Sequence, residues 1–113
     1  MHELALSRSL VAALEEEARL QAFSRVERVT LEIGRLGHVD PDALAFCFDV
    51  ATRATLAEGA RLVIERRPGR ATCMACGEVS EVDAHVVDCP ACGSPRVLVD
   101  GGDEMKIREL EVA

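Results

Sequence analysis

The chain has no tryptophan or tyrosine and only three phenylalanines among its 113 residues. Hydrophobic residues still make up 49% of it, so its core has to be built from aliphatic side chains. This length and composition fit one domain, or a small domain with a module inserted into it.

Basic residues are outnumbered by acidic ones. The chain has 13 Lys and Arg and 20 Asp and Glu, which gives a formal net charge of −7. A nucleic-acid-binding surface needs clustered basic residues, so this balance argues against nucleic acid as a partner. No apolar run approaches the roughly 20 residues of a membrane-spanning helix, and we expect no membrane partner. The first residues lack a basic secretory signal, and Glu15, Glu16 and Glu17 interrupt any apolar run there. We therefore expect a cytoplasmic protein.

Four of the five cysteines form two Cys-x-x-Cys pairs, each followed by glycine. They are Cys73, Cys76, Cys89 and Cys92. Four thiolates spaced in this way can face one point, and zinc binds four of them in a closed tetrahedron. Two disulfides, a redox dithiol and a rubredoxin-like iron site are the alternatives; the paired spacing and the odd number of cysteines favour a metal in a reducing compartment. We expect a structural Zn(II) site, in a module too small to fold without metal.

The hydrophobic pattern predicts two helices on the N-terminal side of this module. Apolar residues at every fourth position predict an amphipathic helix over residues 4–22. Strict alternation predicts a strand over residues 28–33. Asp40 and Pro41 are typical of an N-cap and a first helical residue, so a second helix is expected to run from there to about Thr52. Its predicted apolar face comprises Leu44, Cys47, Phe48 and Ala51, with Cys47 as a packed thiol.

Two further strands complete the prediction. One is centred on residues 62–64, and one closes the chain over residues 105–112, where the alternation slips between Ile107 and Leu110. The expected fold class is therefore α+β, a three-stranded sheet with two helices, plus an inserted four-cysteine module resembling a zinc ribbon. The predicted domains are an α+β domain of residues 1–69 and 100–113 and a zinc-binding module of residues 70–99.

The first three residues offer a second kind of metal chemistry. A terminal amine on Met1, together with the amide nitrogen and imidazole of His2, can chelate one ion through fused rings. Nickel(II) and copper(II) favour such in-plane nitrogen donors, whereas zinc gains nothing from them. Glu3 or Asp40 could add an oxygen. A surface histidine needs no ligand role, and Asp40 also fits a helix cap, so the residues alone leave both interpretations open.

The combination of these features is more specific than any one of them. The initial Met-His-Glu, the leading helix, the stretches 31–36 and 39–44 and the two CxxCG motifs together resemble the HypA/HybF family, over essentially the whole chain. That family consists of nickel metallochaperones for [NiFe]-hydrogenase maturation. The resemblance implies that His2 is the essential nickel ligand, joined by backbone nitrogens, that Glu3 and Asp40 assist, and that the four paired cysteines hold structural zinc.

The same resemblance implies a non-enzymatic protein that carries Ni(II) transiently. Its implied partners are a maturation GTPase and a hydrogenase large-subunit precursor, with urease accessory proteins possible in some organisms, and it would be a monomer or weak homodimer. No nucleophile motif or phosphate-binding loop points to catalysis. The alternatives are a zinc-ribbon adaptor without nickel and an iron-containing electron carrier.

The other two histidines are expected to have no ligand role. Some relatives carry a histidine beside the cysteine pairs that is implicated in pH-dependent remodelling of the zinc site. Here His85 lies in the middle of the spacer, where a solvated hairpin residue is expected, and His38 is expected to be a bystander.

Overall fold

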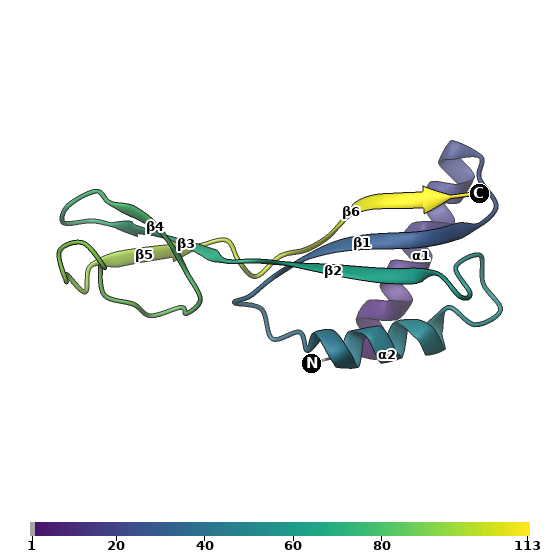
Figure 1. The fold of residues 1–113 in the computed structure, drawn as a ribbon, viewed down its shortest axis with the longest axis horizontal. Coiled ribbons are helices and arrows are strands. Elements are labelled where there is room, and N and C mark those ends of the chain that lie inside the picture. The colour runs from purple at the N-terminus through teal and green to yellow at the C-terminus, as the bar shows by residue number, and fades with distance from the viewer. Residues whose placement is uncertain (1) are drawn as a thin grey trace. The chain divides into compact units, whose positions relative to one another are not determined.

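The computed structural model of the chain describes residues 2–113, which form two helices and six strands (Figure 1). In chain order they are α1 (Glu3–Gln21), β1 (Val26–Gly34), α2 (Pro41–Ala51), β2 (Arg61–Arg67), β3 (Gly69–Cys73), β4 (Val79–Val82), β5 (Val97–Asp100) and β6 (Met105–Val112). The strands make two three-stranded sheets, in the orders β2-β1-β6 and β4-β3-β5. The predicted fold class, a three-stranded sheet with two helices plus a four-cysteine module, is confirmed.

Contacts within the chain define two compact units. Unit 1 comprises the residues up to Leu31, Val39–Glu65 and Ile107–Ala113, and unit 2 comprises Glu32–His38 and Arg66–Lys106. The short segment Glu32–His38 and both flanks of the cysteine module therefore cluster with the cysteines. The division into domains of residues 1–69 with 100–113 and 70–99 stays a prediction.

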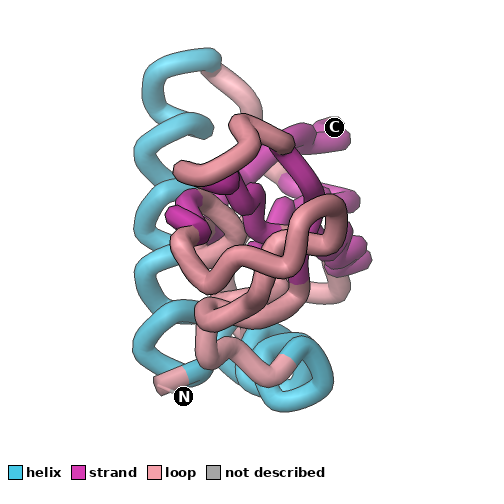
Figure 2. Tube along the Cα trace, turned by 90° about the vertical axis from the view of Figure 1, so that its left-hand side faces the viewer, coloured by secondary structure: helices cyan, strands magenta, loops and turns pink. Residues whose placement is uncertain are grey.

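Unit 1 is built on the packing of α1 against α2, which Figure 2 shows with α2 crossing at the lower end of α1. The buried face of α1 is Ser7, Leu10, Val11 and Leu14, the i, i+3, i+4, i+7 spacing of an amphipathic helix. Leu44 and Phe48 of α2 and the buried side chains of β1 complete an aliphatic core with one aromatic ring. The four-residue periodicity thus predicted α1 to within one residue at each end.

The start of α2 follows from its two N-terminal residues. One carboxylate oxygen of Asp40, Oδ1, accepts hydrogen bonds from the backbone N–H groups of Asp42 at 2.9 Å and Ala43 at 3.3 Å. Pro41 occupies the first helical position, where its missing N–H costs nothing. The predicted helix start is confirmed. On the predicted apolar face, Leu44 and Phe48 are buried, whereas Cys47 and Ala51 are only half-buried, because α1 covers one side of this helix alone.

Unit 2 contains the sheet β4-β3-β5, in which β3 pairs antiparallel with both neighbours. Three glycines allow the segments at its base to approach closely. A Cβ on Gly34 would lie 1.9 Å from the carbonyl oxygen of Gly102, and one on Gly102 would lie 2.7 Å from the backbone of Gly69. The Leu36 amide donates to the Gly102 carbonyl and the Arg35 amide donates to the Arg67 carbonyl, both at 2.7 Å. Both flanks of the cysteine module are thus tied to the segment after β1.

In the part of the chain that the structure describes, neither helix is long and apolar enough to cross a membrane.

Candidate metal centre

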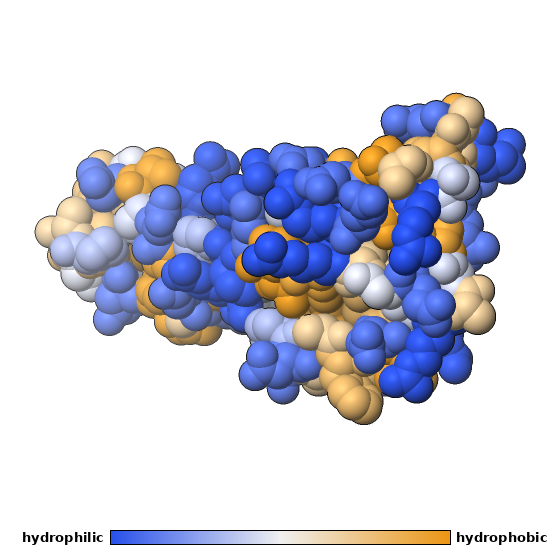
Figure 3. Space-filling view, turned by 45° about the vertical axis from the view of Figure 1, so that its right-hand side comes forward, coloured by the Kyte–Doolittle hydropathy of each residue, from blue (hydrophilic) through white to orange (hydrophobic). Residues whose placement is uncertain are grey.

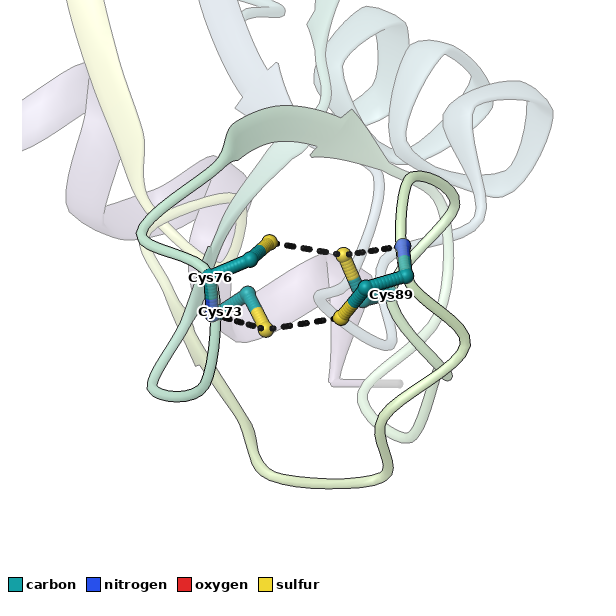
Figure 4. Close-up of side chains that lie close together, drawn as sticks. Cys73, Cys76 and Cys89 are labelled. Carbon is teal, nitrogen blue, oxygen red and sulfur yellow. Dashed lines mark hydrogen bonds between the residues drawn. The ribbon is translucent and has the colours of Figure 1, made fainter.

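The four paired cysteines come together at one end of the sheet β4-β3-β5. The Sγ atoms of Cys73, Cys76, Cys89 and Cys92 all lie within 4.8 Å of one another. Figure 4 shows Cys73 and Cys76 facing Cys89 across the centre of the cluster. Within residues 2–113 this is the one group of three or more His, Cys, Asp or Glu side chains close enough to share a metal ion.

A tight turn presents the first pair. The Gly77 amide donates to the Cys73 carbonyl at 2.9 Å, and the amides of Ala75 and Cys76 point at the Cys73 sulfur at 3.3 and 3.4 Å. Gly77 has a φ of 78°, a left-handed conformation that glycine adopts without steric cost. The glycine after the pair therefore lets the backbone close around the thiolate.

The second pair repeats this geometry. The Gly93 amide donates to the Cys89 carbonyl at 2.8 Å, and the amides of Ala91 and Cys92 both lie 3.4 Å from the Cys89 sulfur. Gly93 has a φ of 76°. Two turns of the same construction thus bring their sulfurs to a common point, as the repeated motif predicted.

The amide groups aimed at the sulfurs favour thiolate forms. Hydrogen bonds from the backbone N–H groups of Cys76 and Ala75 lower the pKa of Cys73 to about 6. The Cys92 N–H likewise lowers the pKa of Cys89. The pKa of Cys76 is instead raised to about 12: a bond from the Glu78 N–H lowers it, but burial and the adjoining thiols outweigh that bond. Four adjoining thiolates repel one another, so a bound cation favours the state in which all four are ionised.

The cluster fits zinc in both donor type and size. A tetrahedral zinc with Zn–S bonds of about 2.3 Å has sulfurs about 3.8 Å apart. The Cys73–Cys92 and Cys76–Cys89 sulfurs are 3.6 and 3.7 Å apart, far beyond the roughly 2.05 Å of a disulfide bond. All four cysteines are free thiols, as is Cys47. Four sulfur ligands leave no open position, so the ion that these residues would hold is structural: it would bind the two turns to each other.

The residues at the start of α1 are arranged differently. His2 is exposed and sits at the N-cap position with φ 56° and ψ 33°, a left-handed conformation that is uncommon outside glycine. Its carbonyl accepts the first helical hydrogen bond, from the Leu6 amide at 3.0 Å, while its imidazole makes no capping bond to the helix. Glu3 follows in the first turn and is half-buried. Met1 lies outside the described residues.

The family model described as "Hydrogenase/urease nickel incorporation, metallochaperone, hypA" matches residues 1–112. The chain belongs to the HypA family. It is 53% identical to the hydrogenase maturation factor HypA of Alkalilimnicola ehrlichii and 49% identical to HypA 2 of Bradyrhizobium diazoefficiens, over 112 residues and 99% of each chain in both cases. The solution structure of the Ni metallochaperone HypA from Helicobacter pylori superimposes with a TM-score of 0.72 at 29% identity, covering 99% of this chain and 97% of that one.

Membership in the HypA family confirms the interpretation of the sequence as a nickel metallochaperone of hydrogenase maturation. The family is one of metallochaperones and maturation factors. The cysteine cluster fits the accompanying structural zinc.

Asp40 has a defined structural role in this HypA-family chain, since its Oδ1 atom caps α2. Within the described residues, His2, Glu3 and Asp40 do not form a ready-made cluster of the kind that the cysteines form. Figures 1 and 2 both place the N-terminal end of α1 beside α2 in unit 1. The nickel ligands predicted from the sequence therefore stay a prediction.

Two contacts in unit 2 could not be predicted from the sequence. His85 is exposed, as expected, but its Nε2 atom lies 2.9 Å from the carbonyl oxygen of Leu36, to which it donates. Arg35 forms an ion pair at 3.2 Å with Asp83 in the same loop. The spacer between the cysteine pairs is thus fastened to residues 35–36, and no local pattern marks partners so far apart in sequence.

A polar cavity of about 380 Å³ in unit 2 also lay outside the sequence prediction. Its lining includes Glu32, Arg67, Arg70, Asp100, Gly102 and Lys106. Glu32 is only 16% exposed and accepts from Arg67 at 3.0 Å, with Lys106 at 3.4 Å from its other oxygen. The hydrogen bond from Arg67, with help from Lys106, lowers the pKa of Glu32. Every cation named here already has an acidic partner, so the cavity is electrically balanced.

Proposed function

We propose that this HypA-family chain binds Ni(II) at its N-terminus through His2 and delivers it to a hydrogenase large-subunit precursor, while Zn(II) stays fixed at the cysteine cluster. The observation that supports this most directly is the exposed His2, in a left-handed conformation before α1, with an imidazole that the helix does not use. Non-glycine residues in this conformation concentrate at functional sites. The zinc ligands in this proposal are Cys73, Cys76, Cys89 and Cys92.

The two ions are sorted by ligand type. The nickel site proposed here joins the Met1 amine, the His2 amide nitrogen and the His2 imidazole, and such nitrogen donors suit the square-planar or tetragonal geometry of Ni(II). The positive end of the α1 dipole disfavours a bound cation. The negative charges of Glu3 in the first turn and of the deprotonated amide offset this repulsion. The resulting affinity is moderate, as release to a recipient requires.

Asp40 is proposed as a further oxygen ligand that keeps its structural role. Both of its capping hydrogen bonds end on Oδ1, so Oδ2 is the atom assigned to nickel. The site assembles when the metal arrives, because the exposed His2 imidazole makes no capping bond to α1 that would have to break first.

A maturation GTPase is the proposed supplier of nucleotide hydrolysis, and the large-subunit precursor is the proposed recipient, with urease maturation as a further destination. The proposal places the protein in the cytoplasm, as a monomer or weak homodimer. The electron-carrier alternative is tested by colour, since iron at four thiolates makes the protein red.

The decisive experiment is a nickel titration of untagged protein by calorimetry, with zinc measured on the same samples. His2→Ala is expected to abolish stoichiometric nickel binding and to leave zinc content unchanged. His38→Ala, which changes another exposed histidine, is the matched control and should bind nickel like the wild type. One residue added before Met1 should weaken binding, because it moves the terminal amine. Stoichiometric nickel uptake by the His2→Ala protein would refute the site.

A further inference from the structure

The sheet β4-β3-β5 has one covered face and one uncovered face. Ala71 and Cys73 of β3 are buried on the covered face, and alternate residues of β4 and β5 are half-buried on the same side. Thr72, which is half-buried, lies on the other face with the exposed residues Val79 of β4 and Leu98 of β5. Outward positions of such a sheet are ordinarily polar.

The uncovered face instead carries an aliphatic row. Thr72 of β3 is paired with Val79 on β4 and with Leu98 on β5, so the three side chains stand side by side across the sheet. Val79 is 54% exposed and Leu98 is 60% exposed. Met74, in the turn after β3, is also exposed, at 60%. In Figure 3, hydrophobic side chains interrupt the hydrophilic surface of this module.

The apolar residues on the uncovered face are not needed to pack this sheet against its own unit. On β4 the polar Ser80 is half-buried on the covered face, while its apolar neighbour Val79 faces solvent. Exchanging Val79 and Ser80 would give the ordinary pattern of apolar residues on the covered face and polar residues on the exposed one, because side chains alternate between the two faces. Single exposed apolar residues need no explanation, but a contiguous group rimmed by charge is typical of an interaction site.

The charge around the row indicates the kind of partner. The next row across the sheet is Glu81, Arg70 and Asp100, with Arg70 already paired to Asp100 at 3.6 Å. Residues 70–104 contain only Arg70 and Arg96 as basic residues, against Glu78, Glu81, Asp83, Asp88, Asp100, Asp103 and Glu104. Zinc bound by four thiolates adds a further charge of −2. Nucleic acid, an anionic membrane and a second copy of the same acidic face are all repelled by this surface.

We propose that the uncovered face docks a basic segment of a protein with which the chain exchanges nickel. The aliphatic row on this face is defined as Val79 and Leu98, which flank Thr72. The segment carries two or three aliphatic side chains that cover the row and a Lys or Arg that meets Glu81. The proposal rests on the nickel-delivery function and adds to it a surface that recognises the other protein through the zinc module.

The probes are overlapping peptides that cover the hydrogenase large-subunit precursor and the maturation GTPase of the same organism, titrated against the zinc-loaded full chain. Peptides with aliphatic and basic residues are expected to bind. Leu98→Ser should weaken this binding about tenfold or more, since it removes an aliphatic side chain that the bound peptide covers. Glu81→Gln should weaken binding and reduce its salt dependence. Leu20→Ser is the matched control: Leu20 is 63% exposed on α1, and this change should leave peptide binding intact.

Zinc content and chemical unfolding of each variant show that it is folded. The proposal is overturned if no peptide binds, if Leu98→Ser binds like the wild type, or if sedimentation shows that the row instead joins two copies of the chain. Nickel affinity, measured in parallel, should be equal in the wild type and Leu98→Ser. Loss of nickel binding in the wild type itself would count against the proposed function and not against the docking surface.

Discussion

At the scale of single residues, two kinds of contact fix the side chains described above: bonds between near neighbours in the sequence and bonds between residues far apart in it. Asp40 before Pro41 predicted a helix cap because capping depends on neighbours two and three residues away. The cysteine spacing likewise specified two turns of identical construction. The bond from His85 to Leu36 and the pairing of Glu32 with Arg67 join residues 49 and 35 positions apart, so only the folded chain shows them.

Glu32 gives a prediction at this scale. Because Arg67 and then Lys106 favour its charged form, the pKa of Glu32 lies below the ordinary value of 4.5. Its ion pairs therefore stabilise unit 2 fully above pH 4.5, and that contribution is lost as the pH falls through the lowered value. A carbon-13 NMR titration of the Glu32 carboxyl should give a midpoint below 4.5.

Arg67→Ala should move this midpoint upward toward 4.5, since it removes the largest cause of the shift. Arg70→Ala is the control, because Arg70 pairs with Asp100 and makes no contact of this kind with Glu32. An unchanged midpoint in Arg67→Ala would show that the pairing does not persist in solution.

At the scale of elements, hydrophobic periodicity predicted the helices and strands that are long enough to repeat the pattern. The predictions for α1, β1, α2 and β6 lie within two residues of the observed bounds, and the slip in β6 reappears as two half-buried residues, Ile107 and Leu110, three positions apart. The strands β3, β4 and β5 were not predicted. They have four or five residues each, and their pairing joins positions as distant as Arg70 and Asp100.

The start of α2 allows the two roles of Asp40 to be separated. Asp40→Ala removes the cap and should destabilise the protein by about 1 kcal/mol, as measured by urea unfolding. Asp40→Asn keeps an oxygen that can accept from the Asp42 and Ala43 amides, so its stability should stay close to that of the wild type.

Nickel affinity tests the second role of Asp40, as a metal ligand. If Asp40 supplies an oxygen to the metal, Asp40→Asn should weaken nickel binding despite its intact cap, because the negative charge is gone. Equal nickel affinity in the wild type and Asp40→Asn would leave Asp40 with the cap alone.

At the scale of the whole molecule, unit 1 and the cysteine module of residues 70–99 depend on different forces. Unit 1 buries aliphatic side chains from both helices and from β1. Across residues 70–99, the buried apolar residues are only Ala71, Cys73 and Cys89. Two of these three are proposed zinc ligands, so the metal itself has to replace a hydrophobic core there.

Removal of zinc with a chelator should therefore act on one unit. Amide signals of β3, β4 and β5 should lose their dispersion and their protection from hydrogen exchange, while the helical circular dichroism of α1 and α2 persists. Cys73→Ser should reproduce this loss, because three thiolates no longer close the tetrahedron. Cys47→Ser is the matched control, since Cys47 lies outside the cluster, and it should retain both zinc and the sheet. Protected amides in the metal-free sheet would mean that backbone pairing alone holds β4-β3-β5 together, and that zinc adds only to its rigidity.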